Sequence, residues 1–477
     1  MTLTSSCFVV SQASLILILL NKAAQVQQFF LLTFCALSVA KGMIIIMKIV
    51  AFLPAKGTSE RMPSKNLILL DGKPLFLHTL EKLCKCSFID EVYLDSESTK
   101  ILEYADYLDY ISLKRDSSLA NNTTDGHQMF YNEVAQVDAD IYIQILGTSP
   151  FIKPETIKKG IEVLLKDDKY DSVVLVRKEK QYHWNENGPK YNTENIPNSN
   201  ELSDTIIETM GLYIVRKETA HKFRKRIGKT PYLLEADPIE AVDVNYPADF
   251  EVAQNIAKGL RMNEVSKLRA LAKHLNSSIF SDIIDEYTGK HVIAGLKPNL
   301  IYSKFMGRAN TLKIRLLKEG EDYRGIYKAL ETYQKIGEGE VIIVENESAG
   351  FAYFGELNAN LAVRSGALGA IVSSVTRDAL EVENLGFPVF SVGHSCTDVR
   401  GRATMENHNK PILIDGVKID PGDLIFADIN GIVIIPQKYE KEVLERAILS
   451  IEKEKTILGK IMNDIDALEI YQTVGEF

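Results

Sequence analysis

Short apolar runs and amphipathic stretches alternate along the chain after residue 46. Apolar runs bounded by polar residues predict strands, and apolar positions three to four apart predict helices. The first half has expected helices at 74–84, 156–165 and 248–258, and expected strands at 48–54, 91–94, 141–146, 173–176, 211–215 and 241–244. This alternation predicts an α/β domain with a mainly parallel sheet that is covered on both faces.

A second α/β block follows a polar, helix-prone segment at 263–277, which we interpret as a linker. Asn430-Gly431 is typical of a tight hairpin turn between two strands, and a charged helix is expected over 438–455. The strands expected in this block are 341–345, 370–374, 388–391, 423–427 and 432–436. The pattern thus predicts two domains, 47–262 and 278–477.

Residues 1–46 form an apolar leader that we expect not to belong to the fold. Its apolar runs, Leu15–Leu20 and Phe29–Ala40, are shorter than the ~20 residues that a membrane-spanning helix needs. Ser38-Val39-Ala40 resembles a signal-peptide cleavage site, but no Lys or Arg precedes the first run. We expect translation to start at Met43 or Met47, and a membrane anchor or a signal peptide are the alternatives.

Composition limits the possible partners without locating any chemistry. The 477 residues include 64 acidic and 55 basic side chains, which gives a formal net charge of −9. This balance argues against broad nucleic-acid binding but permits a local phosphate site. The five cysteines form neither a disulfide framework nor a zinc motif, so a reducing, cytoplasmic location is expected. A membrane contact is expected only if the leader is retained.

A basic loop, Pro54–Asn66, follows the first predicted strand. Loops at the carboxyl ends of strands in open α/β sheets are common ligand sites. Gly57 would let the backbone approach a phosphate closely, and Lys56, Arg61 and Lys65 would neutralise its charge. The Walker pattern is absent, and a solvated basic loop is the alternative interpretation. We interpret another basic run, Lys222–Lys229, as a solvated helix face.

Residues 48–74, with Lys65-Asn66 and Gly72-Lys73-Pro74, resemble the opening of the sugar-nucleotide cytidylyltransferases, in particular the acylneuraminate type. The resemblance covers about 47–262 and includes Thr148-Ser149-Pro150. It implies a Rossmann-like nucleotidyltransferase domain that transfers CMP from CTP to an acidic 2-keto sugar of nonulosonate type. Magnesium or manganese would assist the transfer.

The same resemblance implies roles for individual residues. Arg61 and Lys65 would be catalytic, Asp243 would bind metal, and the nucleotide would be bound by Ala55, Lys56, Gly57, Ser59 and Asn66. The chain departs from the family at Lys56, which replaces an arginine, and at Leu146, Met210 and Asn245, which replace glutamine, asparagine and aspartate. Loss of a carboxylate weakens magnesium binding. We therefore expect either an unusual sugar acid as substrate or reduced activity, and a degenerate nucleotide-binding domain is the alternative.

The second block places Gly355-Glu356-Leu357-Asn358 at an expected loop–helix junction, and Arg377-Asp378 just beyond the next strand. Amides at a helix start suit a carboxylate or phosphate, and an arginine can grip a keto acid through two hydrogen bonds. An aspartate can hold a divalent metal. A surface arginine and aspartate at a strand end are the alternative interpretation.

Twenty residues separate Glu356 from Arg377, which resembles the Gly-Asp/Glu-x20-Arg-Asp signature of the RraA-like family. Segments 386–390, 421–423 and 430–433 also match. The resemblance implies a β/α sandwich, a trimeric ring, and a class II aldolase or oxaloacetate decarboxylase. In such an enzyme Glu356 would orient metal-bound water, Asp378 would bind magnesium or manganese, and the pyruvyl keto acid would contact Gly355, Glu356, Leu357, Asn358 and Arg377.

Together the two resemblances predict a bifunctional sugar-acid enzyme. The expected partners are CTP, an acidic sugar and a pyruvyl keto acid, with no nucleic acid. A homo-oligomer is expected, either a dimer, a trimer or a hexamer. The alternative is a degenerate nucleotide-binding domain fused to a regulatory or scaffolding trimerisation module.

Overall fold

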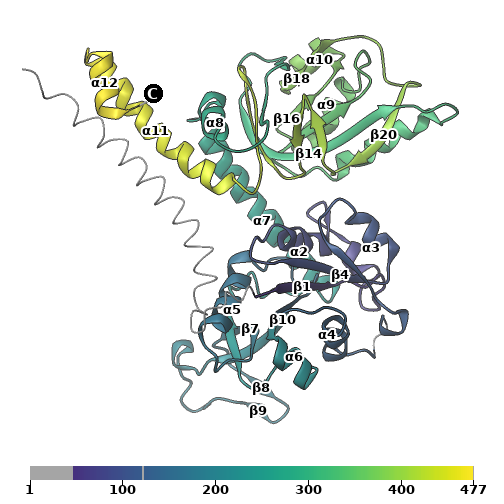
Figure 1. The fold of residues 1–477 in the computed structure, drawn as a ribbon, viewed down its shortest axis with the longest axis vertical. Coiled ribbons are helices and arrows are strands. Elements are labelled where there is room, and N and C mark those ends of the chain that lie inside the picture. The colour runs from purple at the N-terminus through teal and green to yellow at the C-terminus, as the bar shows by residue number, and fades with distance from the viewer. Residues whose placement is uncertain (1–46, 121–122, 476–477) are drawn as a thin grey trace, which may run out of the picture. The chain divides into compact units, whose positions relative to one another are not determined.

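The computed structural model describes residues 47–120 and 123–475, so the predictions for the leader lie outside the described residues (Figure 1). The contacts divide the chain into two compact units. One comprises the described part of Met1–Leu67 together with Leu75–Asn245, and the other comprises Ile68–Pro74 together with the described part of Tyr246–Phe477. Among the described residues, no helix combines the length and the apolar character needed to span a membrane.

The first unit is built on a seven-stranded sheet with the order β11-β7-β10-β6-β1-β4-β5. Strand β1 lies inside the sheet and runs parallel to both of its neighbours, β4 and β6, whereas β10 is antiparallel to β6 and β7. The mainly parallel sheet is therefore confirmed. The strands are β1 (Ile49–Pro54), β4 (Glu91–Ser96), β5 (Ile111–Lys114), β6 (Ile141–Ile145), β7 (Ser172–Glu179), β10 (Thr205–Arg216) and β11 (Pro231–Glu235).

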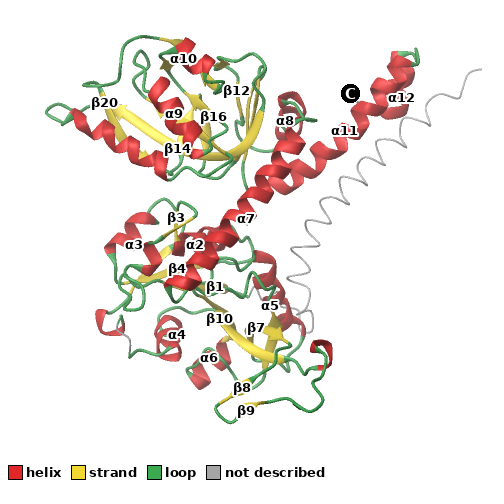
Figure 2. Cartoon of the chain, turned by 180° about the vertical axis from the view of Figure 1, so that it is seen from behind, coloured by secondary structure: helices red, strands yellow, loops and turns green. Residues whose placement is uncertain are grey.

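Helices cover both faces of this sheet (Figures 1 and 2). Ala51 and Leu53 of β1 pack with α2 and α5 in one buried cluster. Val50 and Phe52 pack with α4 and α6 in another. A strand buried on both sides requires an uninterrupted apolar run, which β1 has. The helices of this unit are α2 (Leu75–Cys84), α3 (Thr99–Tyr104), α4 (Gly126–Val134), α5 (Pro154–Lys166) and α6 (Lys217–Phe223).

The second unit contains a nine-stranded sheet centred on a long strand, β14. Strands β14, β15, β16 and β18 are mutually parallel in that order. On the other side of β14 the sheet continues with β23, which is antiparallel to β14, and with β24, which is antiparallel to β23. The strands are β12 (Val292–Ile293), β13 (Lys297–Pro298), β14 (Phe305–Leu316), β15 (Glu340–Asn346), β16 (Gly369–Val372), β18 (Val389–Ser391), β20 (Ala403–His408), β23 (Leu424–Asp428) and β24 (Gly431–Ile435).

Helices and short elements complete the second unit. The segment 263–277 forms the end of α7 and the start of α8. The helices are α7 (Pro247–Ala272), α8 (Ser277–Ile284), α9 (Glu356–Ser365), α10 (Ala379–Asn384), α11 (Glu440–Met462) and α12 (Ala467–Val474), with the 3₁₀ segment η4 (Tyr323–Gln334). The remaining short elements of the described chain are β2 (Leu69–Leu70), β3 (Lys73–Pro74), β8 (Trp184–Asn185), β9 (Gly188–Pro189), β17 (Val375–Thr376), β19 (Gly393–His394), β21 (Ile412–Ile414), β22 (Val417–Ile419), η1 (Lys65–Leu67), η2 (Ser117–Leu119) and η3 (Ser199–Glu201).

Two local predictions differ from the structure. The strand expected at 241–244 is wrong, because this segment is a turn and an extended loop. The Val244 amide donates to the carbonyl of Thr148, just after β6, at 2.9 Å. The segment does not form the repeated backbone hydrogen bonds of a β-ladder. The β23–β24 hairpin is confirmed, but Asp428 pairs with Gly431, so Ile429 and Asn430 form the turn.

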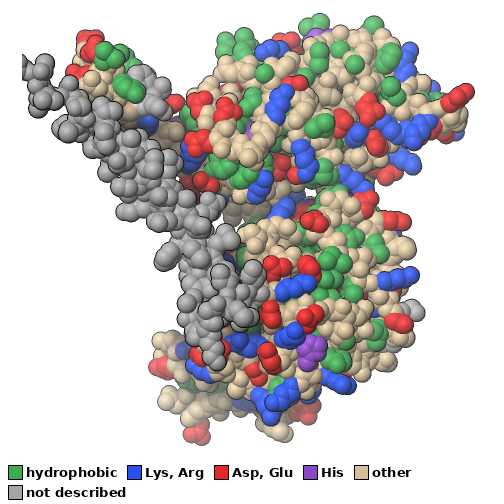
Figure 3. Space-filling model, viewed as in Figure 1, with side chains coloured by type: hydrophobic (Ala, Val, Ile, Leu, Met, Phe, Trp, Pro, Cys, Tyr) green, Lys and Arg blue, Asp and Glu red, His purple; other side chains and the backbone are tan. Residues whose placement is uncertain are grey.

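Charged side chains of both signs are interspersed on the face shown in Figure 3. One ion pair is instead buried in the first unit, where Arg115 binds Asp95 at the end of β4. The Nε atom lies 3.0 Å from Oδ1 and the Nη2 atom 2.8 Å from Oδ2. Asp95 is 0% exposed and Arg115 4% exposed. A buried carboxylate of this kind depends on its partner because water cannot reach it.

Replacing Arg115 with methionine should lower the free energy of unfolding of the first unit by about 3–5 kcal/mol. The physical reason is that the Asp95 carboxylate would remain buried without a counter-ion. Urea unfolding of the full chain, followed by circular dichroism, would measure the loss. The control is Lys48→Met, because the Lys48–Glu91 ion pair is solvent-exposed and should contribute less than about 1 kcal/mol. Equal losses in the two variants would contradict the prediction.

Candidate functional site

The loop after β1 is held in place by three hydrogen bonds. The Ala55 amide donates to the Asp95 carbonyl at 2.9 Å, and the Gly57 amide donates to Glu97 Oε1 at 2.7 Å. Asn66 Nδ2 donates to the Lys56 carbonyl at 2.8 Å, so the loop also closes on itself. A Cβ atom at Gly57 would lie 2.7 Å from Ser98 Cβ. Glycine is therefore required here by packing against Ser98.

The far end of this loop meets the segment around Asp243. Lys65 Nζ lies 3.2 Å from Asn245 Oδ1, and Asn245 Nδ2 donates to the Asp243 carboxylate. Ser149 Oγ, just after β6, lies 3.5 Å from Asp243 Oδ1. The structure thus brings together the predicted phosphate-binding Lys65 and the predicted metal-binding Asp243. Lys65 is buried, as is its neighbour Asn66.

The other predicted residues of the loop lie between these two fixed ends. Arg61 is exposed, and Lys56 and Ser59 are partly buried. They therefore belong to the same loop as Lys65, at the carboxyl edge of the sheet, where ligands of open α/β sheets bind.

A second polar layer lies on the α4 and α6 face of the sheet and was not predicted. Gln144 of β6 donates through Nε2 to Glu133 Oε2 at 2.6 Å. Glu133 is completely buried, and burial together with the nearby Asp95 charge raises the pKa of its carboxyl well above the ordinary value. Arg226 Nη1 lies 3.4 Å from Gln144 Oε1. The sequence contains one weak indication of this polar layer, because polar residues stand at the ends of otherwise apolar strands.

The interpretation of Lys222–Lys229 as a solvated helix face is wrong for Arg226. Helix α6 ends at Phe223 because Arg224 adopts a left-handed conformation with φ of 53°. The chain then turns and buries Arg226 against the ring of Tyr213. Sequence spacing could not reveal this, because helical periodicity does not apply beyond the cap.

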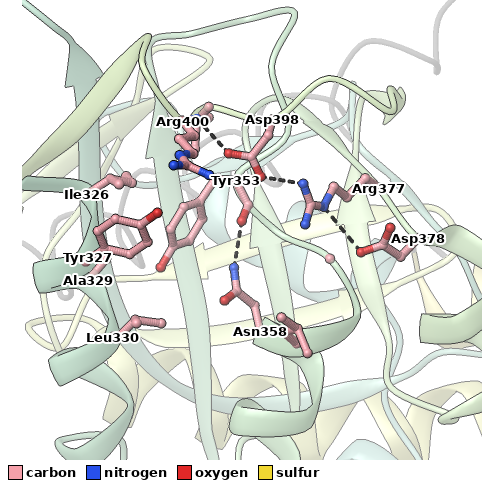
Figure 4. A pocket seen from close by; sticks show the side chains of 13 residues that line it. Ile326, Tyr327, Ala329, Leu330, Tyr353, Asn358, Arg377, Asp378, Asp398 and Arg400 are labelled. Carbon is pink, nitrogen blue, oxygen red and sulfur yellow. Dashed lines mark hydrogen bonds and ion pairs between the residues drawn. The ribbon is translucent and has the colours of Figure 1, made fainter. Parts of the chain in front are cut away.

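The second unit has a cavity of about 450 Å³ at the start of α9 (Figure 4). Its walls come from the 3₁₀ segment η4, the loop before α9, and the loops that follow β17 and β19. The cavity is lined by Ile326, Tyr327, Ala329, Leu330, Tyr353, Gly355, Leu357, Asn358, Arg377, Asp378, Asp398, Val399 and Arg400. Five of the predicted residues, Gly355, Leu357, Asn358, Arg377 and Asp378, therefore line one cavity.

Arg377 lies between two carboxylates in this cavity (Figure 4). Its Nη1 atom forms an ion pair with Asp398, and its Nε atom lies 3.3 Å from Asp378 Oδ2. The Glu356 amide donates to the same Asp378 oxygen at 3.1 Å. A Cβ atom at Gly355 would lie 2.5 Å from that oxygen, so any other residue would displace the Asp378 carboxylate. The Asp378 carboxylate thus accepts the hydrogen bond of the first backbone amide of α9.

Asp398 and Arg400 are cavity residues that the sequence interpretation missed. Asp398 Oδ1 accepts a hydrogen bond from the Arg400 amide at 2.6 Å. Their position could have been inferred from the parallel pairing of β16 and β18, because the loops that follow neighbouring parallel strands meet at one edge of the sheet. The Glu356 side chain is exposed at the start of α9.

Metal-ligand chemistry is sparse in both units. The described residues contain no group of three or more His, Cys, Asp or Glu side chains able to hold a metal ion. The carboxylates at the two sites are Asp243 in the first unit and the Asp378 and Asp398 pair around Arg377 in the second.

Comparison with protein families assigns both units. Residues 50–240 match the cytidylyltransferase family model, and residues 278–434 match the model described as Aldolase/RraA. The chain combines a cytidylyltransferase domain with an RraA-like domain. Both predicted resemblances are thereby confirmed, together with the α/β class of each domain.

Relatives match separate parts of the chain. It is 29% identical over 188 residues to protein DlpA of Legionella pneumophila, covering 39% of this chain and 30% of that protein. It is 34% identical over 123 residues to CMP-N,N'-diacetyllegionaminic acid synthase of the same organism, covering 24% of this chain and 53% of the synthase. The chain thus spans about a third and about half of the lengths of these two relatives.

A third relative is a Halalkalibacterium halodurans protein whose assignment as a 4-hydroxy-4-methyl-2-oxoglutarate aldolase is provisional. It is 26% identical over 196 residues, which cover 41% of this chain and 89% of that protein.

Proposed function

We propose that the cytidylyltransferase domain transfers CMP from CTP to an acidic 2-keto sugar of the nonulosonate type. The observation that carries the proposal is that Lys65, in the loop after β1, contacts Asn245, which in turn donates a hydrogen bond to Asp243. A match to a synthase of CMP-N,N'-diacetyllegionaminic acid supports this class of acceptor. The acylneuraminate type is our choice among the acidic sugars that such relatives use.

The proposed reaction is an in-line displacement at phosphorus. The anomeric hydroxyl oxygen forms a bond to the α-phosphorus of CTP and releases its proton to water. The bond from that phosphorus to the bridging oxygen of the β-phosphate breaks, and pyrophosphate leaves. Lys56, Arg61 and Lys65 neutralise the charge that develops on the phosphates. Asn66 holds the Lys56 carbonyl and so orients the loop around the nucleotide, with Ala55, Gly57 and Ser59 as the other nucleotide contacts.

Asp243 fits a magnesium or manganese ion that arrives with the triphosphate. Magnesium usually keeps several waters and uses one or two carboxylates besides the substrate phosphates. The donor set here, one carboxylate with the Ser149 hydroxyl and the Asn245 amide nearby, suits such a site. When bound, the ion would supply further neutralisation of the triphosphate charge.

The RraA-like domain is proposed to act on a pyruvyl keto acid. Arg377 would bind the carboxylate of that acid in competition with Asp398, and Glu356 would orient a water molecule. Asp378 would hold the divalent cation, which supplies electrostatic stabilisation of the charge that develops on the keto oxygen. The cavity of about 450 Å³ around Arg377 supports this assignment.

One observation favours the alternative, a regulatory or scaffolding second domain. Arg377 already contacts two carboxylates, Asp378 and Asp398, so a substrate must displace or share one of them. A homo-oligomer is proposed for either case, with the second domain as the trimerising part.

Replacing Lys65 with methionine should reduce kcat/KM for pyrophosphate release by about 100-fold, because a buried cation beside the reacting phosphates is lost. The assay contains the full chain, CTP, magnesium and N-acetylneuraminate, a legionaminate or 3-deoxy-manno-octulosonate. Lys48→Met serves as the control, since Lys48 pairs with Glu91 at the protein surface. Failure of the unchanged protein to release pyrophosphate with any of these acids would overturn the proposed transfer.

Replacing Asn245 with aspartate should lower the magnesium concentration needed for half-maximal pyrophosphate release, because a second carboxylate strengthens binding of a hard cation. A magnesium titration at fixed CTP measures the change. Asn187→Asp adds the same charge at an exposed turn and should leave the titration unaltered. An identical magnesium requirement in Asn245→Asp and the parent chain would argue against Asp243 as a metal ligand.

Replacing Arg377 with alanine should reduce pyruvate release from oxaloacetate or 4-hydroxy-4-methyl-2-oxoglutarate by about 100-fold, because the bidentate contact to the substrate carboxylate is lost. Lactate-dehydrogenase-coupled detection of pyruvate would follow the reaction with magnesium present. The matched control is Arg364→Ala, an exposed arginine near the end of α9. Equal activity in Arg377→Ala and the parent would exclude this site, and no release by the parent would favour the scaffolding alternative.

A further inference from the structure

Arg226 of the first unit is a buried cation that forms no ion pair with an acidic side chain in the described part of the chain. Its side chain is only 8% exposed, and no carboxylate among the described residues lies within ion-pair distance of it. Its Nε atom has no hydrogen-bond partner in the described chain. Burying an unpaired charge is costly. The site is therefore electrostatically incomplete and suited to an anion.

The protein groups around Arg226 orient the guanidinium without neutralising it. The group stacks on Tyr213, with its central carbon 4.0 Å from the ring centroid. Nη1 lies 3.4 Å from Gln144 Oε1, and Nη2 lies 3.9 Å from Met210 Sδ. These long contacts leave one edge of the guanidinium, formed by Nε and Nη2, without a strong acceptor. That edge is the one that binds a carboxylate through two parallel hydrogen bonds.

The neighbouring acidic side chains are engaged elsewhere. Asp125, whose charge interacts with that of Arg226, caps α4 and accepts hydrogen bonds from the His127 and Gln128 amides. Asp95 is bound by Arg115, and Glu133 accepts from Gln144 Nε2. Glu208 accepts a hydrogen bond from the Tyr213 hydroxyl. Because Gln144 donates to Glu133, its Oε1 atom faces Arg226 as an acceptor. The surrounding network thus holds the arginine in a fixed orientation.

Arg226 lies at the same sheet edge as the proposed nucleotide loop. Tyr213 of β10 pairs with Gln144 of β6, and β6 is hydrogen-bonded on its other side to β1. Gln144 stands next to the last residue of β6, so the arginine lies at the carboxyl end of that strand. The loop that begins at Ala55 leaves the carboxyl end of β1 one strand away.

Met210 contacts Arg226 and is itself partly open to solvent. It is 43% exposed, has a φ of 62°, and places its sulfur near both the Tyr213 hydroxyl and Arg226 Nη2. A methionine side chain is unbranched and flexible. It can therefore move aside without disturbing the buried network beneath it.

We propose that Arg226 is the carboxylate receptor of the first domain, binding the acid group of the sugar through its Nε and Nη2 atoms. Gln144 and Tyr213 are positioning residues for the guanidinium, and Met210 is the side chain that moves aside. The ligand class is a sugar with a carboxylate next to its anomeric carbon, so that the carboxylate contact fixes the attacking hydroxyl. This assignment rests on the proposed transfer reaction.

The test uses the full chain with Arg226→Met and Arg226→Lys. At saturating CTP, Arg226→Met should raise KM for the acidic sugar about 10- to 100-fold, while KM for CTP stays unchanged. Arg226→Lys should recover only part of this loss, because an ammonium cannot make the forked contact. Lys222→Ala is the control, since Lys222 is exposed on α6 and lies over the ring of Phe223, and it should leave both KM values unaltered.

A second measurement works without turnover and separates recognition from a structural role. Thermal unfolding is recorded without CTP, in N-acetylneuraminate or in its uncharged methyl ester. The parent chain should be stabilised by the acid and not by the ester, and Arg226→Met should respond to neither. In buffer alone, Arg226→Met should unfold at the same or a higher temperature than the parent, because an uncompensated buried charge is removed.

Each outcome separates the receptor role from the transfer reaction. Unchanged KM and an unchanged response to the acid in Arg226→Met would overturn the receptor role and leave the transfer reaction standing. A response to the acid that depends on Arg226, without pyrophosphate release by the parent, would support the receptor and reject the transfer. Neither response nor turnover in the parent would reject both.

Discussion

Parallel hydrogen bonding of β1 to β4 and β6 is the constraint on which the first domain depends. Strands in such an arrangement are buried on both faces, so polar side chains are confined to their ends. Asp95 and Gln144 stand at the carboxyl ends of β4 and β6 and are both buried. Each must therefore find a polar partner inside the protein, and those partners come from loops that the strand order brings to one edge.

The two domains use the same kind of edge but balance charge differently. In the second domain the loops after β16 and β18 supply Arg377 and Asp398, which pair at a partly exposed cavity. In the first domain Arg115 forms an ion pair with Asp95, whereas Arg226 has no carboxylate within ion-pair distance among residues 47–120 and 123–475. The charge of the paired arginine at the cavity is thus balanced by protein carboxylates, whereas that of the buried arginine is not.

Local patterns predicted those elements whose burial is uniform. Strand β1 and helix α5 each have a continuous or regularly spaced apolar face, because each packs on a single type of surface. Strand β14 was missed, since Arg308, Asn310 and Lys313 interrupt its apolar pattern. These side chains are accommodated by partners distant in sequence, such as Glu264 and Glu440 for Arg308 and Glu340 for Asn310. The segment 241–244 has the reverse property, an apolar local pattern without a neighbouring strand.

The sequence by itself determined the two α/β domains, the basic loop after the first strand, and the Glu356 and Arg377-Asp378 segments, because these depend on local periodicity and on motif spacing. Only the tertiary structure decided which charged and polar side chains meet. The pairing of Lys65 with Asn245, the pairing of Arg377 with Asp398, and the burial of Arg226 against Tyr213 join residues from separate loops. Their proximity follows from strand order and from the left-handed turn at Arg224, neither of which a local pattern encodes.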